Sequence, residues 1–289
     1  HGEERSFTII AYPVPEIGEK FPEIFAETVA INTLDYQKYQ TMQQRLIDVL
    51  DQARTVHIQG ANGNRTDLTV AIYSLSDPQT QTAFENCVAD VNIPVGEVFT
   101  SPVLKGTNGV LHVSEVFLNG LRYENLELTF ADGMITSYTC TNFTSEEENQ
   151  RYVKDHVLMH HDTLPMGEFA IGSNTLAYAI ARNMDLLSRM PILLAEKMGP
   201  HVAVGDPCFA RGEDAPVFNL YDHKEMVARE NERTARRGEG GDVYTNVHTD
   251  ITLAFDELAA LDGVRPDGSR IPVLRNGRFV LPGTELLNE

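Results

Sequence analysis

The 289-residue sequence predicts an α+β fold with mixed sheets, hairpins and flanking helices. Helical and extended patterns interleave without a regular strand–helix–strand alternation, which argues against a parallel sheet with crossover helices. The pairs Asn119-Gly120, Asp132-Gly133 and Asn276-Gly277 each lie between apolar runs, and such pairs are the strongest short-range signal of a hairpin. Hydrophobic residues make up 42% of the chain, which is enough for a sizeable core.

The first third of the chain predicts one helix between short strands. Phe7–Tyr12 is predicted as a strand that the following two prolines close. A helix is predicted over residues 36–53, where apolar side chains recur at helical spacing: Tyr39, Met42, Leu46, Val49 and Leu50. The stretches "TVHIQG" (55–60) and "TDLTVAIYSL" (66–75) predict two strands around the turn "ANGN".

The middle and the end of the chain alternate between sheet and helix. Residues 98–140 are rich in strand-forming types and include the first two hairpin pairs. Thr144 and Glu147 form a capping box, so a helix is expected to begin there. A further helix is predicted over residues 174–187. Residues 222–237 predict a polar helix or a solvated excursion, and Asn276-Gly277 predicts a last hairpin.

The composition excludes several classes of function. The formal net charge is −19, whereas nucleic acids and anionic membranes are bound by clustered Lys and Arg. There is no run of 18 apolar residues, so no transmembrane helix is predicted. The three cysteines are widely spaced and no CxxC motif occurs, so a disulfide framework is not expected. A reducing cytoplasm is therefore the predicted compartment.

The stretch "YTNVHTDITLAF" (244–255) places an imidazole and a carboxylate side by side. Its β-branched and aromatic residues predict a strand. Residues i and i+2 of a strand point to the same face, so His248 and Asp250 share a face about 7 Å apart along the chain. Taken alone, such a pair is more often a hydrogen-bonded pair on the solvated face than a metal site.

Three other stretches place acids or histidines beside tight turns. Glu97 follows Gly96, Glu168 follows Gly167, and Glu196 and His201 flank a Gly199-Pro200 break. Each has an ordinary alternative: Glu97 as a strand-end acid in solvent, Glu196 as a helix-terminal acid and His201 as a core histidine. A buried carboxylate, however, is costly unless it is paired or bound to a metal.

Taken together, four acids and two histidines at structured turns predict a site for two divalent cations. Oxygen and imidazole ligands suit zinc, cobalt or manganese. Four carboxylates and two divalent cations also balance in charge before any bridging hydroxide is added.

The order of these motifs resembles the M29 metallo-aminopeptidases of the aminopeptidase T type. The matching pieces are "NIPVGEVFTSP", "GEFAIG", the Glu196/His201 spacing, H-x-D and "IPVLRNGRF", and the resemblance runs over nearly the whole chain, from "AYPVPEIG" near the start to "LRNGRF" near the end. The resemblance implies a homodimer that removes N-terminal residues from peptides with two metal ions, usually zinc or cobalt. Carried over by motif, the metal positions are Glu97, Glu168, Glu196, His201, His248 and Asp250.

The sequence departs from the family pattern in three places. By the resemblance, residues 1–289 are expected to be the metal-binding catalytic domain without the α/β domain that normally precedes it, either because the sequence is a fragment or because that domain was lost. After H-x-D the family more often has "FMIGS", where this chain has "ITLAF". Seven residues after His201 the resemblance implies a tyrosine that reaches the reacting carbonyl, but this chain has Cys208. Either Tyr221 or Tyr244 takes that role, or the peptidase is slow, or the loop runs differently and Cys208 is a small buried hydrophobic residue.

The predicted function is therefore hydrolysis at the free amino terminus of a peptide. The two metals would polarise the scissile carbonyl and lower the pKa of a bridging water. Glu97 is either a metal ligand or, as the preferred alternative, the group that shuttles the proton to the leaving amine instead of ligating. A mononuclear iron oxygenase is the first alternative, because His201, His248 and Asp250 have the composition of a facial triad. A non-catalytic metal-binding module is the second.

Overall fold

The computed structural model confirms the α+β fold and describes residues 8–10, 12–89, 92–187, 190, 192–209, 215–240 and 242–289. The helices are α1 (Phe21–Asn32), α2 (Tyr36–Leu50), α3 (Glu146–His156), α4 (Thr175–Asn183) and α5 (Ile192–Ala195). Single 3-10 turns are η2 (Pro15–Ile17), η4 (Glu196–Met198), η5 (Thr234–Glu239), η6 (Phe255–Glu257) and η7 (Glu285–Asn288). No described helix combines the length and the apolar character needed to span a bilayer.

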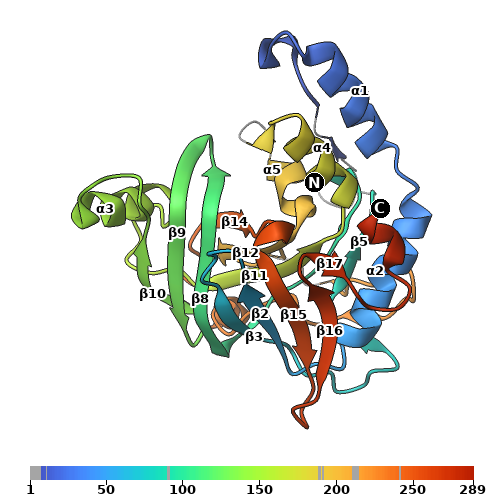
Figure 1. The fold of residues 1–289 in the computed structure, drawn as a ribbon. Helices are drawn as coiled ribbons and strands as arrows, with labels where there is room; N and C mark the ends of the chain where they lie inside the picture. The colour runs from blue at the N-terminus through green and yellow to red at the C-terminus, as the bar shows by residue number, and fades with distance from the viewer. Residues whose placement is uncertain are drawn as a thin grey trace.

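The larger sheet is antiparallel and has the strand order β10-β9-β8-β3-β2-β15-β16-β17. Its long hairpins dominate the left and lower parts of the molecule (Figure 1). The strands are β2 (Thr55–Gly60), β3 (Asp67–Ala71), β8 (Val103–Leu118), β9 (Leu121–Ala131), β10 (Met134–Thr139), β15 (Leu258–Val264), β16 (Arg270–Arg275) and β17 (Arg278–Phe279).

The predicted hairpins are confirmed by their backbone conformation. Asn119 and Gly120 join β8 to β9 with φ of 52° and 78°, and Asp132 and Gly133 join β9 to β10 with φ of 43° and 70°. Two successive residues with positive φ form the turn whose twist matches that of the flanking strands. The pair at residues 276–277 joins β16 to β17 in the same way.

The smaller sheet has the order β14-β12-β11-β7-β5 and is also antiparallel. Its strands are β5 (Glu85–Cys87), β7 (Glu97–Thr100), β11 (Met166–Gly172), β12 (Pro200–Gly205) and β14 (His248–Thr252). Two short parallel pairs complete the sheets: β1 (Ile9–Ile10) with β6 (Asn92–Ile93), and β4 (Gln81–Thr82) with β13 (Glu225–Met226).

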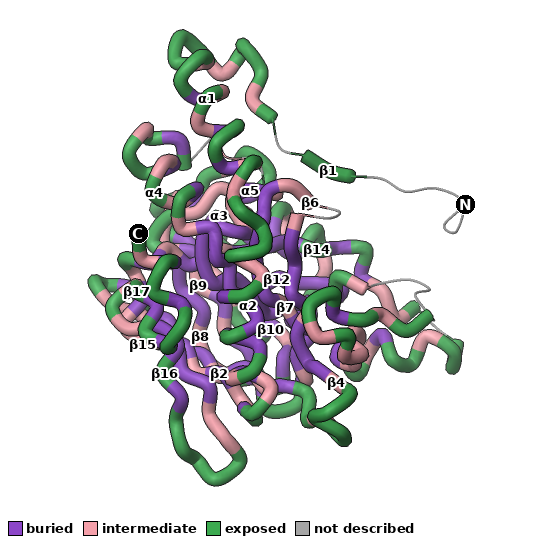
Figure 2. The backbone as a smooth tube through the Cα atoms, turned by 90° about the vertical axis from the view of Figure 1, so that its right-hand side faces the viewer, coloured by how far each residue is buried: buried purple, intermediate pink, exposed green. Residues whose placement is uncertain are grey.

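Both sheets contribute to one apolar core. One face of the smaller sheet supplies Val98, Phe169, Ile171, Val202, Val204 and Ile251 to the same cluster as Val56, Ile58, Leu68 and Leu111 of the larger sheet. The tube of β7 and β12 is accordingly coloured as buried in the middle of the molecule (Figure 2). The smaller sheet is thereby held rigidly in the interior, while its opposite face is free for other side chains.

Helix α2 anchors the strand that carries Glu97. The Gln43 amide on α2 donates to the backbone oxygens of Glu97 and Cys87, and its side-chain oxygen accepts from Ser173 Oγ at 2.9 Å. A Cβ on Gly96 would collide with the Gln43 side chain, so the glycine next to Glu97 permits this close approach. At the top of Figure 1, α4 and α5 lie between α1 and the sheets.

Several predicted boundaries are corrected by the structure. The cap of α3 is Ser145, which accepts from the Glu148 amide, one residue beyond the predicted Thr144 box. Helix α4 ends at Asn183 instead of residue 187, and β14 covers only His248–Thr252. Within the predicted strand Phe7–Tyr12, residues 9–10 form β1, and Phe7 and Ala11 lie outside the described residues. Residues 222–237 do not form a long helix; the segment contains the short strand β13 and the beginning of the 3-10 helix η5.

Candidate metal centre

The predicted ligands gather on the face of the smaller sheet opposite the apolar core. Glu168 on β11 lies opposite Ala203 of β12, which in turn lies opposite Asp250 of β14. Directly opposed residues of antiparallel strands point to the same face. By the same registers Glu97 of β7, His201 of β12 and His248 of β14 share that face. Four strands that are far apart in sequence therefore bring these five side chains together.

Small residues between the ligands leave room above this face. Ala170, Gly172, Ala203 and Gly205 alternate with the ligands along β11 and β12. A Cβ on Gly172 would lie 2.6 Å from the Lys197 carbonyl oxygen, so only glycine lets η4 pass over the sheet here. This close passage places Glu196 and Lys197 over the same face as the ligands.

Glu168 lies between the two histidines. Its Oε1 is 3.4 Å from His201 Nε2, and its Oε2 is 3.4 Å from His248 Nε2. Further out, His201 Nε2 is 3.5 Å from Glu97 Oε2, and His248 Nε2 is 3.4 Å from Asp250 Oδ1. The five side chains thus form two adjacent sets of donor atoms that share the Glu168 carboxylate.

These nitrogen–oxygen distances match the distance between two ligands of one metal ion better than the length of a hydrogen bond. Hydrogen bonds from nitrogen to oxygen are mostly about 2.7–3.2 Å long. Two ligands that each lie about 2.1 Å from one tetrahedral cation are about 3.4 Å apart. The four nitrogen–oxygen distances of 3.4–3.5 Å therefore leave space for a cation between each histidine and its carboxylates.

Backbone carbonyls orient both imidazoles. The Nδ1 of His248 donates to the Asp206 carbonyl at 2.7 Å, and the Nδ1 of His201 faces the Gly199 carbonyl at 3.2 Å. Such outer contacts place the proton on Nδ1 and direct the Nε2 lone pair towards the cluster, as is usual for histidine ligands. Asp206 is itself fixed, because its carboxylate accepts from Thr245 and Asn246.

A buried lysine bridges two of the acids. The Nζ of Lys197 donates to Glu97 Oε1 at 2.6 Å and to Glu196 Oε1 at 2.9 Å, and its side chain has 0% exposure. Glu97 is therefore held through Oε1, and its Oε2 is a buried atom without a hydrogen-bond partner that faces His201. Glu196 lies at the edge of the cluster with 15% of its side chain exposed.

The charged groups of the cluster shift one another's pKa values. Burial opposes ionisation of Glu168, but its contacts with the two histidines hold its pKa well below the usual range. Burial also disfavours the charged form of His201, yet Glu168 and Glu97 raise its pKa to about 9. Burial and the nearby Glu97 charge raise the pKa of Glu196 to about 7. Protons thus compensate charge that divalent cations would otherwise neutralise.

The donor set fits divalent metal ions. The close groups of possible ligands are Glu97, Glu168 and His201, and Glu168, Cys208 and His248, with donor atoms in each group within 4.8 Å of one another. The unpartnered Glu97 Oε2 agrees with a missing ligand, because a buried carboxylate oxygen normally has a partner. In the described part of the chain, neither group includes Glu196 or Asp250, so both are outer members of the predicted set, although Asp250 Oδ1 lies 3.4 Å from His248 Nε2.

A cleft of about 460 Å³ opens beside Asp250. Its walls come from the end of β8, from α4 and α5, and from the segment that follows β14. Val116, Leu118 and Met198 contribute apolar surface, whereas Glu115 and Glu257 contribute carboxylates. The cleft is thus large enough for an amino-acid side chain and lies against the cluster.

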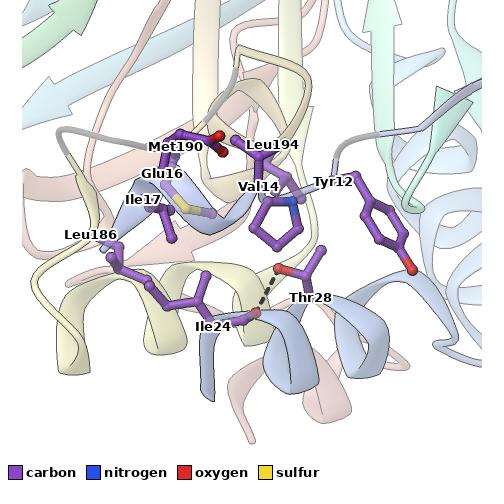
Figure 3. Close-up of a pocket in the computed structure, with 10 residues that line it drawn as sticks. Tyr12, Val14, Glu16, Ile17, Ile24, Thr28, Leu186, Met190 and Leu194 are labelled. Carbon is purple, nitrogen blue, oxygen red and sulfur yellow. Dashed lines mark hydrogen bonds between the residues drawn. The ribbon is translucent and has the colours of Figure 1, made fainter. Parts of the chain in front are cut away.

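A second cavity, of about 510 Å³, lies away from these ligands (Figure 3). The segment 12–17, helix α1 and Leu186, Met190 and Leu194 line it, and none of the predicted ligands does. Its lining is mostly apolar, with Thr28 already bonded to the Ile24 carbonyl. This cavity therefore supplies no ligand to the metal cluster.

Two histidines lie outside the cluster, and two residues near it were not predicted from the sequence. His57 pairs with Asp67 at the surface, and His112 is buried with Nδ1 accepting from the Arg65 amide, so neither belongs to the cluster. The sequence reasoning missed Lys197 and Asp206. Lys197 directly follows Glu196, but its burial comes only from the passage of η4 over Gly172, and no local pattern indicates it.

Fold and cluster together define a metal-binding α+β protein. A family profile described as Thermophilic metalloprotease (M29) matches residues 19–279. The chain therefore belongs to the M29 family of thermophilic metalloproteases.

Curated relatives of the chain are aminopeptidases. Aminopeptidase PepS of Streptococcus thermophilus is 24% identical over 191 residues, which cover 66% of this chain and 40% of that protein. Aminopeptidase T of Thermus aquaticus is 25% identical over 231 residues, 78% of this chain and 49% of that protein. The chain thus spans less than half of the length of these relatives.

Solved structures share the fold at low sequence identity. Wild-type AmpT from Thermus thermophilus superposes with a TM-score of 0.60 at 19% identity, covering 92% of this chain and 60% of that one. A 2,5-dihydroxypyridine dioxygenase from Pseudomonas putida superposes with a TM-score of 0.54 at 18% identity, covering 91% and 64%. At these identities, the likeness concerns the fold alone.

Proposed function

We propose that this chain forms the metal centre of an aminopeptidase that binds two divalent cations and hydrolyses the first peptide bond of its substrate. The position of Glu168 carries the proposal, because one of its oxygens faces each histidine at 3.4 Å. One cation would lie among Glu97, Glu168 and His201, and the other among Glu168, His248 and Asp250. The aminopeptidase relatives support the choice of reaction.

The charge of the cluster also supports two cations. The carboxylates of Glu97, Glu168, Glu196 and Asp250 carry four negative charges when ionised, and the Lys197 ammonium offsets one of them. One divalent cation would leave a net negative charge in a buried site, which is costly. Two would leave a single positive charge, which one further anionic ligand would balance.

The cluster and its surroundings have distinct roles in the proposed reaction. Bound divalent cations supply Lewis acidity towards the scissile carbonyl and lower the pKa of water. His201 and His248 hold their Nε2 atoms towards the centre through their backbone contacts. The apolar wall of the adjacent cleft excludes water from the side chain of the N-terminal residue, and nearby carboxylates attract its free amine.

Glu97 is better placed as a ligand than as the proton shuttle assigned from the sequence. Lys197 Nζ donates to Oε1 at 2.6 Å and holds that oxygen in place. Oε2 then remains directed at the centre, where it lacks a hydrogen-bond partner. We therefore propose Oε2 of Glu97 as a ligand, and leave the shuttle to a group with a freer carboxylate, for which Glu196 at the cluster edge is suited.

Metal analysis tests the proposal directly. Protein purified without chelator is expected to contain two divalent cations per chain, zinc, cobalt or manganese, measured by atomic emission together with protein concentration. Removal with a chelator should abolish hydrolysis of a dipeptide amide, and adding the metal back should restore it.

The same measurement separates the two alternatives. One iron per chain would favour the mononuclear oxygenase built on His201, His248 and Asp250, whose fold a dioxygenase shares. Two bound cations without turnover, in this chain and in a longer natural chain alike, would favour a non-catalytic module. The homodimer and the cytoplasmic location remain predictions.

Replacing His248 by alanine is expected to remove one metal and with it most of the activity. Loss of an outer contact to a ligand already weakens metal binding about 10–100-fold, so loss of the ligand should cost at least that. Metal content and turnover of a dipeptide amide are the measurements. His57→Ala and His112→Ala are the controls, and both should keep two metals, because neither histidine contacts the cluster. Full metal content in His248→Ala would contradict the assignment.

A further inference from the structure

Cys208 occupies the place where the second cation needs another donor. His248 Nε2 lies 3.4 Å from both Glu168 Oε2 and Asp250 Oδ1, but among the described residues the close group of donor atoms around it is Glu168, Cys208 and His248, without Asp250. A tetrahedral cation takes four ligands. The sulfur of Cys208 lies in hydrogen-bond contact with Glu168 Oε2, on the same side as His248.

The distance from the sulfur to the imidazole fits coordination to one cation. Sγ is 3.8 Å from His248 Nε2. A tetrahedral zinc ion with bonds of about 2.3 Å to sulfur and 2.0–2.1 Å to nitrogen separates these two atoms by about 3.6 Å. The separation between Sγ and His248 Nε2 is thus within a few tenths of an ångström of that value, whereas the closer contact of Sγ with Glu168 Oε2 would have to lengthen when a cation binds. Glu168, Cys208 and His248 also form one of the close groups of donor atoms.

We propose that Cys208 binds the second cation as a thiolate, beside Glu168, His248 and Asp250. This assignment rests on the two-cation centre proposed above. On binding, the S–H bond breaks, a sulfur–metal bond forms, and the proton passes to solvent. No electron is transferred, so no oxidant or reductant is required.

Charge supports the thiolate. With Lys197 and four ionised carboxylates, two divalent cations leave one positive charge, and a thiolate neutralises it. Thiolate ligands also favour zinc or cobalt over manganese, which prefers oxygen ligands. Cys208, which aligns with a tyrosine in the family pattern, would thus help to select the metal. It would not donate a hydrogen bond to the reacting carbonyl, as the tyrosine is expected to do.

Cobalt substitution tests the assignment without any assay of activity. The metal-free protein is titrated anaerobically with cobalt(II) while the near-ultraviolet thiolate-to-cobalt charge-transfer band and the visible d–d bands are followed. The wild type should bind two cobalt ions per chain, with charge-transfer intensity for one thiolate. Cys208→Ser should lose that band and bind one of the two ions at least about tenfold more weakly.

Cys140→Ser is the matched control. Cys140 is buried and its sulfur contacts Asn149, a contact that serine preserves, so this variant should keep the full band.

The outcomes distinguish the two proposals. Two bound cobalt ions with d–d bands but no charge-transfer band, or a band unchanged in Cys208→Ser, overturn the thiolate and leave the two-cation centre standing. A failure to bind cobalt in every variant overturns the centre and the thiolate together.

Discussion

Glutamine in place of Glu168 should reduce metal affinity and turnover more than any other single substitution in the cluster. The carboxylate is shared, with one oxygen 3.4 Å from each histidine. An amide keeps the shape of the side chain but loses its charge. Its NH2 group cannot coordinate a metal, so only one of the two positions would keep an oxygen ligand from this side chain. Both cations should therefore bind at least about 100-fold more weakly. Competition with a chromophoric chelator measures the affinities, and hydrolysis of a dipeptide amide measures turnover.

Glu127→Gln is a suitable control for the Glu168 experiment. Glu127 lies on β9 and forms a partly exposed ion pair with Arg65. The same change from glutamate to glutamine should therefore leave metal content and turnover unaltered there. If Glu168→Gln retained one cation at wild-type affinity, the shared role of Glu168 would be wrong, and two separate sites or a mononuclear site would replace it.

Methionine in place of Lys197 should destabilise the metal-free protein by about 3–5 kcal/mol. Methionine keeps an apolar stem of similar length but removes the ammonium, which leaves Glu97 and Glu196 without their buried partner. Bound cations would neutralise the same carboxylates, so the loss should be smaller in the metal-loaded protein. Denaturant unfolding with and without metal measures both values.

Lys154→Met provides the comparison for Lys197. Lys154 pairs with Asp162 at the surface, where the two side chains are 37% and 94% exposed. Removing that pair should cost less than about 1 kcal/mol, with or without metal. Equal stability of the Lys197→Met variant and the wild type in the absence of metal would show that the lysine does not balance the charge of the cluster.

Local patterns predicted the elements that depend on neighbouring residues. The turns at Asn119-Gly120 and Asp132-Gly133 require positive φ at both positions, and these residue types adopt it readily. Helix α2 is marked by apolar side chains at helical spacing. Boundaries were less certain: Ser145 and Thr144 are both good caps, and contacts outside the segment decide between them.

The sequence alone also pointed to the residues of the cluster, through tight turns beside acids and through the order of family motifs. It could not show which side chains meet, because Glu97, Glu168, His201 and Asp250 come together only when β7, β11, β12 and β14 pair in one register. A slip of one residue would turn each ligand to the apolar face.

The tertiary structure alone decided the roles of Lys197 and Cys208. Lysine beside glutamate usually indicates a solvated surface, and burial follows here from η4 passing over Gly172. Cys208 faces Glu168 and His248 because the segment after β12 leads back over the sheet face, a path that no local pattern specifies. Sequence determines which groups are available, whereas charge balance and coordination depend on distances between segments that only the packed sheets set.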